Sequence, residues 1–200
     1  GRLTLDVGCG EGRVARDLAS QGHRVVGADS SRKLVVAAAR AAPTIPTVIA
    51  DAAALPFADA CCDLVVAYMS LQDIDDMPRA VWEIARVLEP GGRLCMAIVH
   101  PINSAGCFAS EKAEATFEIK GSYFDTVRYT DRIERGGLTM TFSGAHRPLA
   151  DYFGELESAG FVVEALREVR VDEASAAEAS HHKRWLRVPT FLDLRAKKVR

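Results

Sequence analysis

A glycine-rich turn near the start of the chain limits the possible folds more than any other feature. The apolar run Leu3–Val7 stops at Gly8-Cys9-Gly10-Glu11-Gly12, and apolar residues then recur at helical spacing from Val14 to Ala19. This order predicts a strand, a tight turn and a helix. Glycines in such a turn let the backbone approach a ligand closely, and the first N–H groups of the helix are free to bind it.

The alternation of strand and helix continues along the chain. The expected strands are nearly all apolar, which is typical of a parallel sheet covered on both faces by helices. We expect seven strands, at residues 3–7, 24–28, 47–50, 63–68, 93–99, 161–166 and 191–199, and helices near residues 14–19, 34–39, 78–88 and 148–160. The sequence therefore predicts an α/β protein with a Rossmann-like, seven-stranded, mostly parallel sheet.

The rhythm breaks after residue 100. Residues 101–135 mix Gly, Ser, Asn, aromatic and charged residues without a sustained period, so we interpret them as an insertion. Residues 138–142 are compatible with a strand, and residues 172–180 with a loop or a short helix. Because the segment leaves the fifth strand at the carboxyl edge of the sheet and is longer than an ordinary connection, we expect residues 101–147 to form a substrate cap within a single domain of residues 1–200.

Composition and charge exclude several classes of partner. The 200 residues carry 25 Lys and Arg against 27 Asp and Glu, and this near balance provides no field for nucleic acid. Uncharged apolar runs such as Leu94–Val99 are far shorter than the roughly 20 residues that span a bilayer, so no membrane partner is expected. The five cysteines form no CxxC pair, which favours reduced thiols and a cytoplasmic location. We expect no metal, because Cys61 and Cys62 as strand neighbours should point to opposite faces.

Three aspartates lie at or just after the ends of the first three expected strands. Asp6 lies at the glycine turn, Asp29 ends the second strand 17 residues after Gly12, and Asp51 ends the third. A carboxylate after the second strand can accept both hydroxyls of a ribose, and Asp51 is placed to bind an adenine amino group. Arg13 stands where a dinucleotide fingerprint requires glycine, which disfavours NAD. The pattern thus predicts a nucleoside site at the carboxyl edge of the sheet.

At these motifs the chain resembles class I S-adenosylmethionine-dependent methyltransferases, in particular the small-molecule type 11 group. The similar segments are residues 5–12, 26–30, 51–57, 57–65 and 87–94. The resemblance implies the sheet order 3-2-1-4-5-7-6 with the last strand, residues 191–199, antiparallel. Members of the family usually carry a helix before the first strand, and because this chain starts almost on that strand we expect the N-terminal lid helix to be lacking.

The resemblance also implies S-adenosylmethionine as cofactor and S-adenosylhomocysteine as product. The glycine turn would lie under the methionine part, with the Asp6 carboxylate directed to its amino group. Asp29 would hold the ribose, and Tyr68 and Met69 would border the sulfonium. The full set of expected cofactor residues is Asp6, Gly8, Cys9, Gly10, Asp29, Ser30, Asp51, Ala52, Tyr68 and Met69.

The expected reaction is an in-line displacement that moves a methyl group to O, N or C of a small-molecule acceptor, for which alignment supplies much of the rate. His100 and then His146 are the candidate bases, because a neutral histidine suits proton removal near pH 7. The expected acceptor residues are Gln72, Asn103, Tyr123, Tyr129 and Arg147. A nicotinamide-dependent oxidoreductase and a cofactor-binding protein without turnover are the alternatives, and a monomer or homodimer is expected.

Overall fold

The computed structural model describes residues 2–135, 138–178 and 180–199. The chain divides into two compact units. Unit 1 comprises Gly1–Ile98, Phe153–Leu166 and Asp193–Arg200, and unit 2 comprises Val99–Tyr152 and Arg167–Leu192. None of the described helices is both long and apolar enough to cross a membrane.

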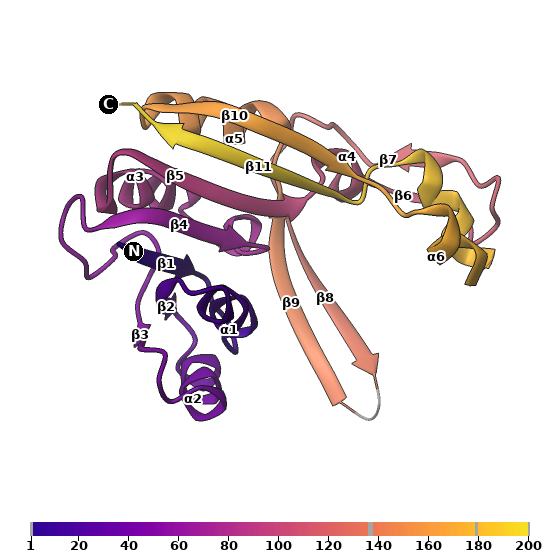
Figure 1. The fold of residues 1–200 in the computed structure, drawn as a ribbon. Helices are drawn as coiled ribbons and strands as arrows, with labels where there is room; N and C mark the ends of the chain where they lie inside the picture. The colour runs from indigo at the N-terminus through magenta and orange to yellow at the C-terminus, as the bar shows by residue number, and fades with distance from the viewer. Residues whose placement is uncertain (1, 136–137, 179, 200) are drawn as a thin grey trace. The chain divides into compact units, whose positions relative to one another are not determined.

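A seven-stranded sheet forms the framework of the fold (Figure 1). Its order is β3-β2-β1-β4-β5-β11-β10, with β1–β5 parallel to one another and β11 drawn in the opposite direction. The strands are β1 Leu3–Val7, β2 Arg24–Asp29, β3 Thr47–Ile49, β4 Cys62–Tyr68, β5 Leu88–Val99, β10 Phe161–Val169 and β11 Phe191–Lys198. The predicted fold class is therefore confirmed, with β10 and β11 as the sixth and seventh strands.

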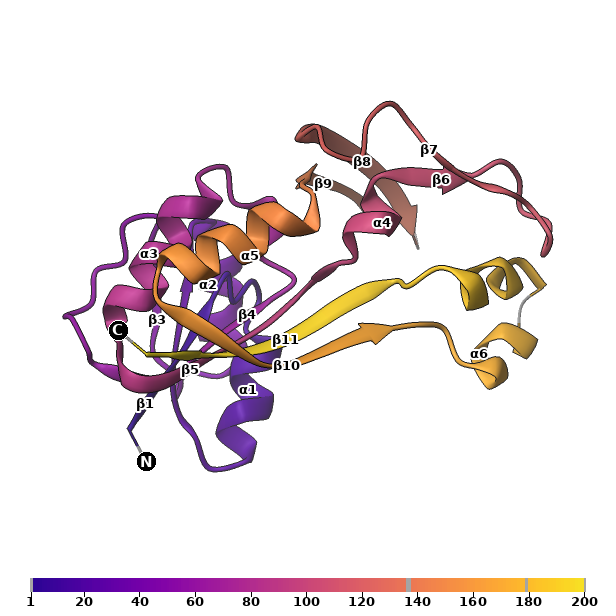
Figure 2. The same cartoon turned by 90° about the horizontal axis from the view of Figure 1, so that it is seen from above.

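Two of the helices beside the sheet, α2 and α3, begin at capping side chains. Ser31 accepts a hydrogen bond from the Leu34 N–H at the start of α2, and Asp76 accepts one from the Arg79 N–H at the start of α3. Figure 2 shows α1 on one face of the sheet and α3 and α5 on the other. These helices are α1 Arg13–Ser20, α2 Arg32–Ala41, α3 Met77–Val87 and α5 Leu149–Ser158, with a short 3-10 helix, η1, at Leu71–Asp73.

The core of unit 1 lies between the central strands and α3. Leu5, Val65 and Leu94 come from three neighbouring strands and are fully buried, as is Ile84 of α3. Each such side chain contributes about 1.5–3 kcal/mol by leaving water. Both faces of these strands are covered, which confirms the buried parallel sheet that the apolar runs predicted.

The start of β5 differs from the prediction. The fifth strand was expected at residues 93–99, yet β5 begins at Leu88, directly after α3, and includes Pro90-Gly91-Gly92. Leu88 pairs with Cys62, and Arg93 pairs with Leu64, so the strand carries a register shift across the glycines. Gly91 has a φ of 84°, a conformation that glycine adopts without strain, and this allows the strand to bulge instead of ending.

Unit 2 contains more regular structure than the irregular insertion that the sequence predicted. It contains two antiparallel pairs, β6–β7 and β8–β9, and β8–β9 runs in register from Val127↔His146 to Arg135↔Leu138. The elements are α4 Pro101–Ser104, β6 Gly106–Phe108, β7 Phe117–Ile119, β8 Val127–Arg135, β9 Leu138–His146, α6 Glu173–Glu178 and the 3-10 helix η2 Ser180–Arg187. The expected strand at residues 138–142 is the first part of β9.

An aromatic cluster joins β6–β7 to η2 inside unit 2. The Phe108 ring packs edge-on against Phe117 and Trp185, with centroids 5.1 Å and 4.9 Å away. Arg184 and Arg187 stack over the same Phe108 ring. Residues far apart in sequence hold these strands, so local periodicity could not predict them.

Candidate functional site

The glycine turn between β1 and α1 is tightly packed at Gly8 and Gly12 and open at Gly10. Gly8, Gly10 and Gly12 all have positive φ, at 72°, 57° and 81°. A Cβ on Gly8 would lie 2.3 Å from the Ser70 Cβ, and one on Gly12 would lie 3.0 Å from the Ala38 Cβ. A Cβ on Gly10 meets nothing within 4 Å. Gly8 and Gly12 therefore allow the turn to pack, whereas Gly10 faces open space where a ligand can approach the backbone.

Asp29, at the end of β2, is tied to the glycine turn. Its Oδ2 accepts the Gly10 N–H at 2.9 Å, and its Oδ1 accepts the Ser31 N–H at 2.8 Å. The half-buried carboxylate thus fixes the turn and the start of α2 together. Each oxygen keeps a second lone pair, so the same group can still accept hydrogen bonds from a ligand.

Asp6, at the carboxyl half of β1, is a buried carboxyl group whose Oδ2 has no hydrogen-bond partner among the described residues. Burial raises the pKa of Asp6 to about 7, and the charge of Asp29 adds to the increase. A hydrogen bond with the Ala15 backbone and the charge of Arg13 act in the opposite direction. A buried acid without a full set of partners is costly unless a ligand completes it, which marks Asp6 as a functional candidate.

Cys9 differs from its neighbours in the turn, because its side chain faces the sheet. A Cβ on Gly27 of β2 would lie 2.9 Å from the Cys9 Sγ, so this close approach requires glycine. Burial raises the pKa of the Cys9 thiol to about 12. The Cys9 side chain is a neutral packing group, and only its backbone lies in the turn.

The other predicted cofactor residues follow neighbouring parallel strands, and parallel strands share one carboxyl edge. Asp51, after β3, is exposed, and its Oδ1 accepts the Ala53 N–H at 2.9 Å. Tyr68, at the end of β4, is 45% exposed and lies under the Arg13 guanidinium at 5.3 Å. Met69 has a φ of 56°, a backbone conformation that is strained for any residue other than glycine. Ser30 is exposed after β2, and Ala52 is half-buried beside Asp51.

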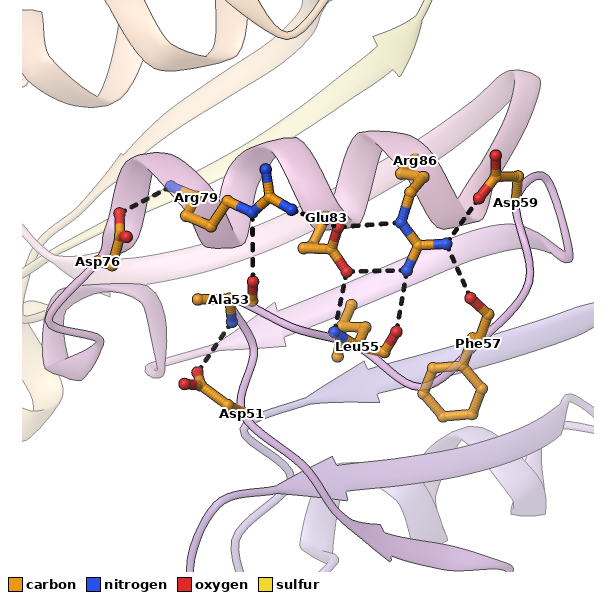
Figure 3. Close-up of polar contacts among 9 residues, drawn as sticks. All are labelled: Asp51, Ala53, Leu55, Phe57, Asp59, Asp76, Arg79, Glu83 and Arg86. Carbon is orange, nitrogen blue, oxygen red and sulfur yellow. Dashed lines mark hydrogen bonds and ion pairs between the residues drawn. The ribbon is translucent and has the colours of Figure 1, made fainter.

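An ion pair on α3, between buried Glu83 and half-buried Arg86, holds the segment that follows Asp51 (Figure 3). Glu83 accepts the Leu55 N–H at 2.9 Å and pairs with the Arg86 guanidinium at 2.8 Å. Arg86 in turn donates to the Leu55 and Phe57 carbonyls and to Asp59, at 2.7–2.9 Å. The hydrogen bond from Arg86 is the largest cause that lowers the pKa of Glu83. We call Glu83 and Arg86 the α3 clamp.

His100 and His146, the predicted bases, both lie in unit 2 with engaged ring nitrogens. The Nδ1 of His100 accepts the Ile102 N–H at 3.1 Å, and its Nε2 lies 3.1 Å from the Glu168 carboxylate. Burial lowers the pKa of His100, and Glu168 opposes this. His100 therefore caps α4 as a neutral ring with its lone pair in use.

His146 is also buried, but one of its partners is a hydroxyl group. Its Nδ1 lies 2.8 Å from the Ser104 Oγ, and its Nε2 lies 2.9 Å from the Tyr123 carbonyl oxygen. Because a carbonyl can only accept, Nε2 carries the proton and Nδ1 is free to accept from Ser104. The Tyr123 hydroxyl accepts the Leu149 N–H at 3.0 Å.

The remaining predicted acceptor residues lie in different places. The Gln72 side chain is in unit 1 and donates to the Met69 carbonyl at 2.8 Å. Asn103 donates to the Thr190 carbonyl in unit 2. Arg147 is buried and Tyr129 is half-buried on β8.

Three groups that contact the candidate residues within their own units were not predicted from the sequence. Ser70 fills the space above Gly8 and donates to the Val7 carbonyl at 2.7 Å. The α3 clamp and Ser104 were also not predicted. Ser70 contacts Val7, which lies 63 positions away, and Glu83 contacts Leu55, which lies 28 positions away. Motif spacing therefore gave no signal for either contact.

Comparison with known proteins identifies this arrangement. A family described as methyltransferase domain matches residues 5–96, which include the glycine turn, Asp29, Asp51 and the α3 clamp. The crystal structure of an S-adenosylmethionine-dependent methyltransferase from Mesorhizobium loti superposes with a TM-score of 0.81 at 24% identity, covering 99% of this chain and 91% of that one.

Curated relatives match between about half and 70% of the chain. A demethylmenaquinone methyltransferase from Renibacterium salmoninarum is 36% identical over 102 residues, which is 50% of this chain and 43% of the relative. Methyltransferase GfsG from Streptomyces halstedii is 41% identical over 149 residues, which is 70% of this chain and 54% of the relative. The chain thus spans about half the length of these relatives.

Proposed function

The chain carries a class I S-adenosylmethionine-dependent methyltransferase domain, and on this premise we propose that it transfers the methyl group of S-adenosylmethionine to a small-molecule acceptor. The observation that carries the proposal is the pairing of an open glycine turn at Gly10 with the unpartnered carboxyl oxygen of Asp6. An amino acid ammonium group bound beside Gly10 would supply the partner that Asp6 lacks.

The residues of unit 1 fit the parts of this cofactor. Asp6 would bind the ammonium group, because a positive charge favours the ionised carboxylate and offsets the cost of its burial. Asp29 would accept the ribose hydroxyls through its remaining lone pairs while still holding the Gly10 N–H. Asp51 and the Ala52 backbone would bind the adenine edge. Tyr68 and Met69, after β4, would border the sulfonium.

When bound, the sulfonium supplies a methyl group with a good leaving group, so the protein must mainly align it and exclude water. The rigid turn contributes to alignment, because Gly8 and Cys9 both donate to the Ala28 carbonyl, at 2.8 Å and 3.1 Å. The Met69 N–H donates to the Ala97 carbonyl at 2.8 Å, which fixes the end of β4. These contacts order the site before a ligand arrives, so less entropy is lost on binding.

We assign acceptor recognition to unit 2, in keeping with the expected role of residues 101–147. The name of the Renibacterium relative, which specifies a quinone-type acceptor, supports a small molecule. His146 is a better base candidate than His100, because its Nδ1 faces a hydroxyl that can relay a proton, whereas His100 is held by a backbone N–H and Glu168. Replacing His146 with Gln should lower kcat with unchanged affinity for S-adenosylhomocysteine, and an unchanged kcat would contradict this choice.

The test is a turnover assay with methyl-labelled S-adenosylmethionine and a panel of small hydroxyl, amine and activated-carbon acceptors. We expect S-adenosylhomocysteine to accumulate only when an acceptor is present, and Gly10→Val to abolish it. Binding of S-adenosylhomocysteine with no transfer to any acceptor would reduce the protein to a cofactor-binding role. Absence of binding would overturn the proposal as a whole.

A further inference from the structure

Two adjacent cysteines at the start of β4 lie side by side, contrary to expectation. The Cys61 Sγ and Cys62 Sγ are 3.5 Å apart. The prediction that these thiols point to opposite faces was wrong, because it assumed a regular strand through both residues. Cys61 precedes β4. Between Cys62 and Leu64, the register of β4 shifts against both neighbouring strands, β1 and β5. The alternation of side chains is therefore broken where the two cysteines lie.

The turn before Cys61 contributes to the same geometry. Ala60 has a φ of 51°, in the left-handed region that side chains other than glycine rarely adopt. Its N–H donates to the Arg86 carbonyl at 3.0 Å, which fixes this turn to the end of α3. The backbone thus holds the two thiols together from both sides, and the pair is formed before any ligand binds.

The chemistry of the pair favours one kind of ligand. A disulfide usually needs Cα atoms 4.4–6.8 Å apart, and neighbouring residues offer about 3.8 Å, so direct oxidation would be strained. Burial raises the pKa of the Cys62 thiol to about 12, which keeps it a neutral, protonated thiol. A soft atom bridging both sulfurs with bonds of about 2.3 Å would subtend roughly 100° at this separation, which suits a pyramidal trivalent centre.

We propose that Cys61 and Cys62 form a vicinal dithiol site for trivalent arsenicals of the arsenoxide class. Two As–S bonds form as the arsenoxide oxygen leaves as water with both thiol protons. Arsenic remains trivalent, and no oxidant or reductant is needed. Half-buried Cys61 is the entry thiol, and buried Cys62 closes the chelate.

The dithiol site lies away from the candidate cofactor residues. Cys62 begins β4 and Tyr68 ends it, and six residues of strand span about 20 Å. Occupation of the dithiol site should therefore leave the affinity for S-adenosylhomocysteine unchanged, and this inference does not depend on the proposed function.

Intact-protein mass spectrometry of the folded chain with phenylarsine oxide tests the site. In excess β-mercaptoethanol, which removes arsenic from single thiols, we expect one phenylarsenic group per chain, released by 2,3-dimercaptopropanol. Cys61→Ser should lose the adduct. Cys107→Ser is the matched control, because Cys107 is an exposed cysteine of unit 2, and it should keep the adduct.

Three results would overturn the proposal. These are an adduct retained by Cys61→Ser, no adduct on the folded wild type, and an adduct that forms only after unfolding. A second readout needs no variant at Cys62, whose substitution could disturb the core. Bound arsenical should raise the melting temperature of the wild type and leave that of Cys61→Ser unchanged, because a ligand that binds the folded state stabilises it.

Discussion

The raised pKa of Asp6 should make cofactor affinity fall as the pH drops below about 7. Without ligand, the Asp6 carboxyl is about half protonated near pH 7. An ammonium group would bind the carboxylate, so below pH 7 binding must first release a proton from Asp6. The affinity for S-adenosylhomocysteine should then fall by a factor of ten for each pH unit below this value.

The expected magnitude is large enough to measure easily. At pH 5 the carboxyl lies two units below its pKa, so binding should be roughly 100-fold weaker than at pH 8, or about 2.7 kcal/mol. The charged groups that act on Asp6 are Asp29 and Arg13, and buried Cys9 stays neutral because its own pKa is about 12. An arginine remains charged over this range and does not contribute a titration of its own.

Calorimetry at several pH values, in two buffers of different ionisation enthalpy, reports both affinity and proton release. Asp6→Asn is the control, because the amide has the same shape and cannot titrate. It should bind weakly with an affinity that no longer changes between pH 5 and pH 7. Equal wild-type affinity at pH 5 and pH 8, or the same slope in Asp6→Asn, would refute the reasoning.

The same shift has a consequence for the ligand-free protein. Because the folded pKa of Asp6 lies above its model-peptide value of 3.8, its contribution to stability is complete below that value and is lost as pH rises through about 7. We therefore expect Asp6→Asn to unfold at a higher temperature than the wild type at pH 8. A lower melting temperature at that pH would contradict the calculated burial cost.

Three further substitutions test other parts of unit 1. Asp29→Ala should weaken S-adenosylhomocysteine binding by about 1.5–3 kcal/mol by calorimetry, the usual value for hydrogen bonds to a charged group, and an unchanged affinity would remove the ribose assignment. Gly10→Val should abolish binding while circular dichroism stays normal, since the φ of 57° favours glycine and a branched side chain would fill the open space that the ligand needs, and retained affinity would move the site elsewhere. Arg86→Ala should cost up to about 3 kcal/mol in chemical denaturation, because buried Glu83 then keeps only the longer pair with Arg79 at 3.6 Å. Arg93→Ala, which breaks an exposed pair with Glu164, should change little, and equal effects would show that the α3 clamp is not special.

The parallel half of the fold could be predicted because its signals are local. Each strand there is a short apolar run, and the first three runs are closely followed by a glycine or an aspartate. The order of the strands came from resemblance to a family, since periodicity does not specify which strands pair. The glycine turn and Asp29 were also identified, because the spacing of their motif is itself the signal.

Unit 2 could not be predicted in the same way. Its strands pair with each other in narrow ladders, and β8 carries charged residues such as Arg128 and Arg132 that hide the alternation expected of a half-buried strand. The prediction that Cys61 and Cys62 point to opposite faces failed for a related reason. The bulge that brings them together depends on pairing with two neighbouring strands, which the local sequence does not show. His100 was found by its position at the end of β5, but only the structure shows that Ile102 and Glu168 use both of its nitrogens.

The central claim is that unit 1 binds an S-adenosyl cofactor at Gly10 and Asp6. Titration calorimetry of the wild-type chain with S-adenosylhomocysteine and, separately, with NAD tests it most directly. We predict saturable binding of one S-adenosylhomocysteine per chain at pH 8 and no heat of binding with NAD. Saturable NAD binding with no response to S-adenosylhomocysteine would contradict the claim.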